Sequence, residues 1–92
     1  MGDIDIRHPH SLPMPQAREE VEQAAQRLSE KFGIQYQWDG DAIDFRRPGL
    51  DGRIALETDE VRVTAKLGFL LSAMRGAIEG EVRRALEKRF SA

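Results

Sequence analysis

The sequence predicts an α+β fold in the order β-α-β-β-β-β-α, an antiparallel sheet with two helices packed on one face. Apolar residues alternate with polar ones in five short segments, which is the period of a half-buried strand. Two longer segments repeat apolar residues every three to four positions, as amphipathic helices do. The chain has 92 residues, too few for two hydrophobic cores, so we expect a single domain over residues 1–92.

The first strand is expected where Ile4 and Ile6 alternate with charged residues, and Pro9 ends it because proline has no N–H to donate to a ladder. A helix then continues to residue 32, with Ser11 as its candidate N-cap and Gly33 as its C-terminal cap. Pro13 and Pro15 fall in the first turn, where amides have no partners. The apolar residues of this helix share one stripe about 100° wide. They are Ala17, Val21, Ala24, Ala25, Leu28 and Phe32.

Four strands follow, each with strict alternation. The apolar positions are Ile34, Tyr36 and Trp38; Ile43 and Phe45; Ile54 and Leu56; and Val61, Val63, Ala65 and Leu67. Asp39-Gly40-Asp41 is typical of a hairpin turn. The other face of the sheet should be solvated. We expect it to carry Arg7, Gln35, Gln37, Arg46, Arg53, Arg62 and Lys66, with Asp5, Asp44 and Glu57 between them.

The last element is predicted as one helix over residues 69–90. Its core stripe would be Leu71, Met74, Ile78, Val82 and Ala85, with Leu86 to one side. Some 22 residues of helix reach roughly 33 Å, whereas a six-residue strand reaches about 20 Å, so one helix end should overhang the sheet unless the helix crosses it diagonally.

One phenylalanine and four small residues gather on the opposite side of this last helix. They are Phe69, Ala73, Gly76, Ala77 and Gly80. Each interior glycine costs a helix about 1 kcal/mol against alanine, so two of them call for a reason. Either this face meets a partner, such as a second copy or an apolar surface, or it packs sideways against the first helix.

Composition and pattern exclude several classes of function. A net charge of −2 argues against a general nucleic-acid clamp. Tyr36, Trp38 and Phe45 share the parity of the core, so the solvated face lacks aromatics for base stacking and no nucleic-acid partner is expected. The longest mostly apolar run, residues 67–74, is far shorter than the ~20 residues that span a bilayer. We expect a cytoplasmic protein without a membrane span.

The sequence contains no recognisable catalytic, metal or cofactor site. His8 and His10 lack a third ligand at a familiar spacing, so we expect backbone groups to satisfy their imidazoles. Asp39-Gly40-Asp41 departs from the calcium-loop pattern, since Ile43 and Leu50 stand at the third and last ligand positions. No serine lies in a nucleophile elbow, and the chain has no cysteine and no phosphate-binding glycine loop.

Several segments resemble one known family. The opening Ile4-Asp5-Ile6-Arg7-His8-Pro9-His10-Ser11-Leu12, the run Tyr36-Gln37-Trp38-Asp39-Gly40-Asp41, Asp51-Gly52-Arg53-Ile54, and Leu67-Gly68-Phe69-Leu70-Leu71-Ser72-Ala73 are similar to the polyhydroxyalkanoic acid system family. The resemblance implies a bacterial protein linked to storage polyester, which is made as cytoplasmic granules. It supplies no catalytic residue, because the activity of the family is undefined.

Two functions remain open. The first is a non-enzymatic accessory protein that binds the granule surface, a granule protein or, as a homo-oligomer, itself, through the Phe69–Gly80 face. The second is a carrier or enzyme that holds an acyl or hydroxyacyl ligand between sheet and helices. Its pocket would be lined by Trp38, Phe45, Met74 and Ile78. Neither function requires a cofactor.

Overall fold

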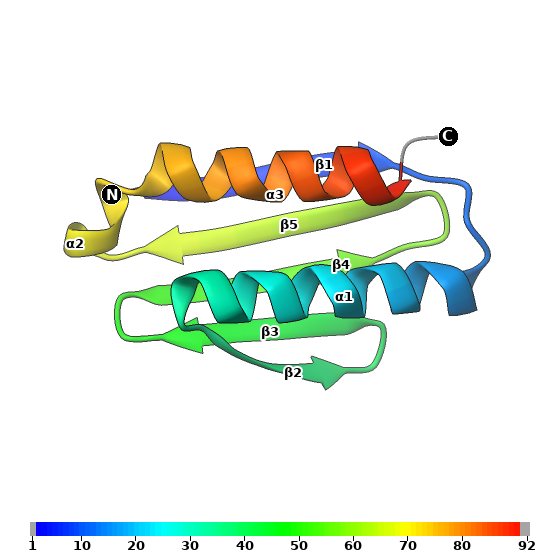
Figure 1. The fold of residues 1–92 in the computed structure, drawn as a ribbon, viewed down its shortest axis with the longest axis horizontal. Helices are drawn as coiled ribbons and strands as arrows, with labels where there is room; N and C mark the ends of the chain where they lie inside the picture. Colours follow the sequence, from blue (N-terminus) through cyan, green and yellow to red (C-terminus); the bar gives the residue numbers. More distant parts are fainter. Residues whose placement is uncertain (1, 91–92) are drawn as a thin grey trace.

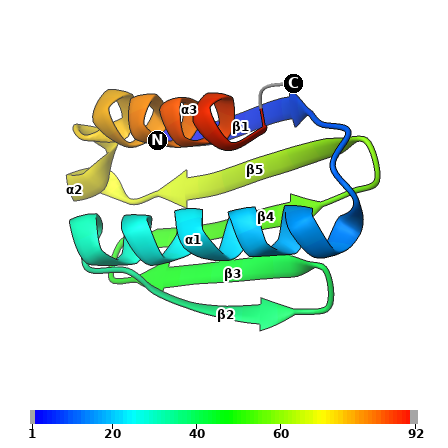
Figure 2. The ribbon, with the colours of Figure 1, turned by 45° about the vertical axis from the view of Figure 1, so that its right-hand side comes forward.

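The computed structural model describes residues 2–90 and confirms the predicted α+β fold (Figure 1). Its elements are β1 (Gly2–Pro9), α1 (Met14–Phe32), β2 (Gln35–Asp39), β3 (Ala42–Arg47), β4 (Leu50–Leu56), β5 (Glu60–Leu67), α2 (Phe69–Ser72) and α3 (Arg75–Phe90). The strands form one antiparallel sheet in the order β1-β5-β4-β3-β2. Helices α1 and α3 lie on the same face of it and run in opposite directions (Figures 1 and 2).

The register of the sheet explains why the alternating apolar residues meet. Ile6 lies opposite Val63, and Val63 lies opposite Ile54. Ile54 in turn lies opposite Ile43, which is paired with Trp38. One apolar row therefore crosses the whole sheet on the side that the helices cover, because a period of two keeps every second residue on one face.

Helix α1 begins later than the predicted Ser11 cap implies. Pro13 occupies the N-cap position, without a side-chain hydrogen bond, and its carbonyl accepts the amide of Ala17 at 2.9 Å. Ser11 lies before the helix and is exposed. Prolines at this end remove only amides that would have no partner anyway, so the helix forms without a polar cap. The predicted C-cap is confirmed, with Gly33 in the left-handed conformation at φ +63°.

The predicted continuous helix over residues 69–90 is wrong, because the chain breaks at Ala73 and Met74 into α2 and α3. At the break the amide of Met74 bonds to the carbonyl of Leu71 at 2.9 Å, a tighter turn than an α-helix makes. This turn lets the chain leave the end of β5 and then run above β1 (Figure 1). Helix α3 of 16 residues spans roughly 24 Å and the eight-residue β1 about 26 Å, so α3 does not outreach β1. The part of the segment that extends beyond the strands is α2 (Figure 1).

The core stripe of the last helix also differs from the prediction. The buried residues of α3 are Ile78, Val82, Leu86 and Phe90. Ala85 is only half-buried, Leu71 is partly buried, and Met74 is 42% exposed. The stripe that places the large Leu86 and Phe90 against the sheet removes more apolar area from water than one that includes Ala85.

His10 is a buried polar side chain at the edge of this core. Its Nδ1 accepts the amide of Leu12 at 3.2 Å, which leaves Nε2 to donate to the carbonyl of Glu57 at 2.7 Å. The ring also packs beside Phe90, with centroids 5.4 Å apart. For His10 the expectation of an imidazole satisfied by backbone groups is confirmed, and the side chain ties the β1–α1 connection to the β4–β5 turn.

Candidate functional site

The Phe69–Gly80 face lies on α2, on the break that follows it and on the first half of α3. The Phe69 side chain is 91% exposed, Ala73, Gly76 and Ala77 are also exposed, and Gly80 is half-buried. A Cβ atom added at Gly76 or Gly80 would meet no atom within 4 Å. Neither glycine therefore serves a close approach to α1, and both open onto unfilled space.

Phe69, Ala73 and Met74 form what we call the apolar tip, at the end of the molecule where α2 projects beyond β5 (Figure 1). The amide of Gly68, just before α2, donates to the carbonyl of Gly49 in the β3–β4 turn at 2.6 Å. A Cβ atom added at Gly68 would lie 3.2 Å from the Cα of Gly49, so this close approach of the two backbones favours glycine. The start of α2 is thereby fixed to the sheet.

Further contacts hold the apolar tip in place. Leu71 packs on the core. A Cβ atom added at Gly49 would lie 3.5 Å from Cδ1 of Leu71, so this side chain also lies beside the β3–β4 turn. The hydroxyl of Ser72 donates to the carbonyl of Phe69 at 2.7 Å, and Arg75 Nε donates to the carbonyl of Asp3 on β1 at 3.1 Å. Phe69 is thus an exposed aromatic ring on an anchored support.

The four residues of the expected ligand pocket do not meet in one place. Phe45 and Ile78 line the same apolar cavity, which has a volume of about 40 Å³. Met74 lies at the apolar tip, and the indole of Trp38 faces α1. The cavity holds little more than the ~30 Å³ share of a single water molecule.

Trp38 belongs instead to a polar cluster that was not predicted from the sequence. The carboxylate of Glu22 on α1 accepts Tyr36 Oη at 2.6 Å, Trp38 Nε1 at 2.7 Å and Gln26 Nε2 at 3.0 Å. The hydrogen bond from Tyr36, followed by that from Trp38, holds the pKa of Glu22 below its ordinary value, and the same bond raises the pKa of Tyr36. The signal in the sequence was the pair of amphipathic aromatics on one strand, because a partly buried Tyr or Trp usually needs a polar partner.

Arg18 extends this cluster toward the β2–β3 turn. Its guanidinium lies 4.3 Å from the centre of the Trp38 ring and donates to the Asp41 carboxylate at 2.7 Å. The cluster fastens α1 to the edge strand β2. Because every oxygen of Glu22 accepts a hydrogen bond, the carboxylate is suited to holding the strand and not to proton transfer.

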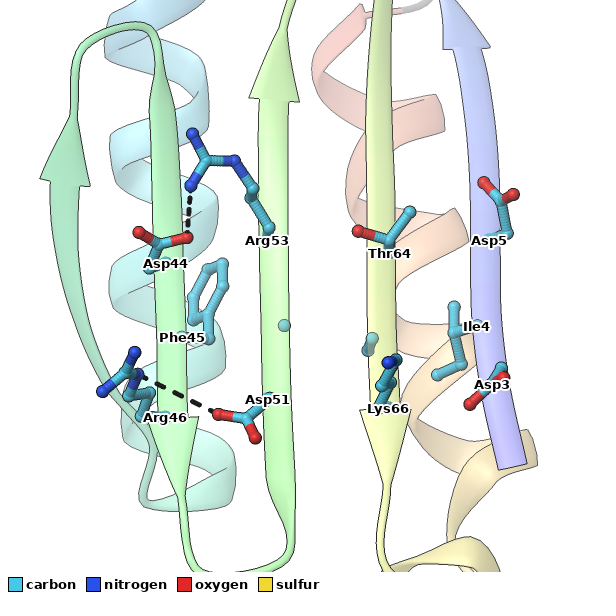
Figure 3. A pocket seen from close by; sticks show the side chains of 12 residues that line it. Asp3, Ile4, Asp5, Asp44, Phe45, Arg46, Asp51, Arg53, Thr64 and Lys66 are labelled. Carbon is cyan, nitrogen blue, oxygen red and sulfur yellow. Dashed lines mark hydrogen bonds and ion pairs between the residues drawn. The ribbon is translucent and has the colours of Figure 1, made fainter. Parts of the chain in front are cut away.

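The uncovered face of the sheet is polar as predicted and is hollowed by an open trough of about 730 Å³ (Figure 3). Its charges are paired between neighbouring strands. Arg53 lies 2.7 Å from Asp44, and Arg46 lies 3.9 Å from Asp51. Beside the trough, Arg62 holds the pKa of Asp5 below its usual range by hydrogen bonding. A carboxylate with a lowered pKa, as in Asp5, suits a solvated surface better than acid–base catalysis.

The described part of the chain lacks two further features. Among residues 2–90 there is no group of three or more His, Asp or Glu side chains placed to hold a metal ion. Within the same residues, no helix has both the length and the apolarity needed to cross a bilayer.

Comparison with known protein families shows which family the chain belongs to. The family model described as "putative polyhydroxyalkanoic acid system protein" matches residues 4–90. The chain belongs to this family. No curated protein sequence and no solved structure matches it.

The match to the polyhydroxyalkanoic acid system family includes both faces described above. Residues 4–90 contain all of β2–β5 and all of α1–α3, and therefore the whole apolar tip. The tip thus lies within the residues that match the family model.

Two serines of this polyhydroxyalkanoic acid system protein have structural roles. Ser29 Oγ donates to the carbonyl of Ile34 at the end of α1, and Ser72 Oγ donates to that of Phe69 within α2. Both hydroxyls are engaged with backbone carbonyls, as is common where helices end.

Proposed function

We propose that this protein is a non-enzymatic accessory component of the polyhydroxyalkanoate storage system that attaches to the polyester granule through its apolar tip. The observation that carries the proposal is the exposed fraction of the Phe69 side chain, 91%. Exposed apolar residues that gather in one patch often mark a contact surface, and Phe69, Ala73 and Met74 are all exposed at the apolar tip. A polyester surface offers apolar contacts to such a patch.

The size of the apolar tip indicates weak, reversible attachment. Burying a phenylalanine side chain contributes about 1.5–3 kcal/mol, and the partly exposed Met74 adds less. Since about 1.4 kcal/mol changes an equilibrium tenfold, one tip raises surface affinity by a few tens- to hundreds-fold. Such a protein would exchange between granule and cytoplasm.

The ligand-binding alternative has less support. Pockets for small molecules usually enclose about 300–1,000 Å³. The cavity beside Phe45 and Ile78 has about 40 Å³, so an acyl chain would have to displace core side chains. The trough on the open face is large enough but is lined mainly by charged groups, which do not suit an apolar chain.

The direct experiment is sedimentation of purified protein with polyester particles. We expect the wild-type chain to pellet in a concentration-dependent way and Phe69→Ser to remain largely in the supernatant. Arg46→Ser is the matched control, because Arg46 is equally accessible but lies on the open face of the sheet. Equal pelleting of all three proteins would refute attachment through the apolar tip. Absence of wild-type pelleting would refute attachment to polyester altogether.

A further inference from the structure

A groove on the outer side of the helix layer, between α1 and α3, is strongly basic. It has a volume of about 210 Å³. Five cationic side chains and one carboxylate line it: Arg27, Lys31, Arg84, Lys88, Arg89 and Glu81. We propose that this groove binds a small polyvalent anion of the diphosphate class, free or as part of a soluble metabolite.

The charge of the groove contrasts with that of the whole chain. Five of the fourteen Lys and Arg residues gather here, but only one of the sixteen Asp and Glu residues. The groove therefore carries a formal +4, whereas the rest of the chain, which totals −2 with it, carries −6. Charge separated in this way creates a local positive potential that net charge conceals.

The single carboxylate does not neutralise the groove. Glu81 lies 2.7 Å from Lys31 Nζ and 3.4 Å from Arg84 Nη1. The hydrogen bond from Lys31, followed by the field of the cations including Arg27, lowers the pKa of Glu81. These ion pairs involve two of the five cations, and among the other three Arg89 pairs with Glu20, which does not line the groove.

Arg89 is the most enclosed of the remaining cations, with 15% of its side chain exposed. Its Nη1 donates to Glu20 at 3.3 Å and to Gln23 at 2.8 Å, which fixes the guanidinium against α1. Within residues 2–90, its Nε and Nη2 donate to no protein atom. An oriented guanidinium with one side of its fork open is suited to a planar pair of acceptor oxygens.

Arg27 and Lys88 have no ion-pair partner within 4.0 Å among the described residues. They come from opposite walls, Arg27 from α1 and Lys88 from α3. Like charges facing each other across a groove repel, and a bound anion removes that repulsion. An anion there should therefore also strengthen the association of the two helices.

The class of anion follows from charge, shape and size. A monovalent carboxylate would leave most of the +4 unneutralised, whereas a diphosphate group carries several negative charges. Guanidinium groups bind phosphate oxygens in a bidentate way, and three of the five cations are arginines. A volume of about 210 Å³ accommodates a group of this size.

Thermal unfolding in sodium diphosphate and in sodium chloride at equal ionic strength tests the proposal, because ligands that bind the folded state raise Tm. We expect a saturable rise in Tm with diphosphate alone. The double variant Arg27→Gln with Lys88→Gln should weaken the apparent affinity at least about tenfold, since charge-assisted hydrogen bonds are lost. Arg7→Gln with Arg46→Gln removes the same charge from the open face and should retain the response.

Three results would overturn the proposal. They are an equal effect of chloride and diphosphate, an equal loss in both double variants, and an orthophosphate response as strong as that of diphosphate. Binding of single-stranded RNA or polyphosphate through the groove without any diphosphate response would also overturn it, in favour of a macromolecular partner. The experiment contains no polyester, so its outcome is independent of attachment through the apolar tip.

Discussion

The carboxylate of Glu22 on α1 accepts a hydrogen bond from the indole nitrogen of Trp38 on β2 at 2.7 Å. β2 is an edge strand, paired only with β3 in this sheet, so half of its backbone has no strand to bond with. The bond to Glu22, with the neighbouring one from Tyr36, attaches this edge to the helix layer by side chains. The stability of the α1–β2 contact should therefore depend on one acidic residue.

Replacing Glu22 by alanine should lower the free energy of unfolding by about 1–3 kcal/mol, because two partly buried donors lose a charged acceptor. Urea unfolding followed by Trp38 fluorescence measures the change. Glu19→Ala is the control, since Glu19 is exposed one turn earlier on the same helix, and its effect should stay within about 0.5 kcal/mol. Similar losses in the two variants would contradict the assigned role.

The contribution of Glu22 should depend on pH in one direction. Its pKa is lowered in the folded state, mainly by the hydrogen bond from Tyr36. A group of this kind stabilises the fold fully above its unfolded pKa, about 4.3, and loses that contribution as pH falls through the folded pKa. The stability difference between wild type and Glu22→Gln should hold at neutral pH and shrink below about pH 4. A difference that grew on acidification would contradict this account.

Removing the imidazole of His10 should destabilise the protein more than removing that of His8. In His10→Leu the amide of Leu12 and the carbonyl of Glu57 lose their partners, at a cost of about 1–3 kcal/mol for each group left buried. His8 is only half-buried, and His8→Gln should change stability by less than about 1 kcal/mol. Guanidinium unfolding of the two variants makes the comparison.

The glycines near the apolar tip should respond oppositely to alanine. A Cβ at Gly68 would lie 3.2 Å from the Cα of Gly49, so Gly68→Ala must shift a backbone contact and should destabilise the fold by about 1 kcal/mol or more. Gly80→Ala meets open space inside α3 and should stabilise it by roughly 0.5–1 kcal/mol. Thermal unfolding measured side by side gives both signs. A stabilising Gly68→Ala would show that the close approach does not fix α2.

The sequence predicted the strands well because alternation is a local signal that burial of one face enforces. It also placed Tyr36, Trp38 and Phe45 on the covered face, where they lie. The break between α2 and α3 could not be predicted in this way, because residues 69–77 are compatible with an unbroken helix. That break follows from the path from β5 to β1, which is a property of the whole fold.

The helical pattern placed Phe69 opposite the core stripe, but it did not indicate the polar contacts between distant elements. The hydrogen bonds of Glu22 connect it to Tyr36 and Trp38, which are 14 and 16 positions away in the chain. No local sequence pattern predicts contacts of this kind. Part of the basic groove is visible in the sequence. Arg27 with Lys31, and Arg84 with Lys88, are each spaced four residues apart, so each pair shares a helix face. Only the antiparallel packing of α1 beside α3 brings the two pairs together.

Single-site labelling tests most directly whether the apolar tip is the surface that contacts polyester. The chain has no cysteine, so Ala73→Cys at the tip and Gln37→Cys on the open face can each carry one environment-sensitive dye. On addition of polyester particles, the account predicts a blue shift of emission from residue 73 and an unchanged spectrum from residue 37. A shift at residue 37, or at neither position, would contradict it.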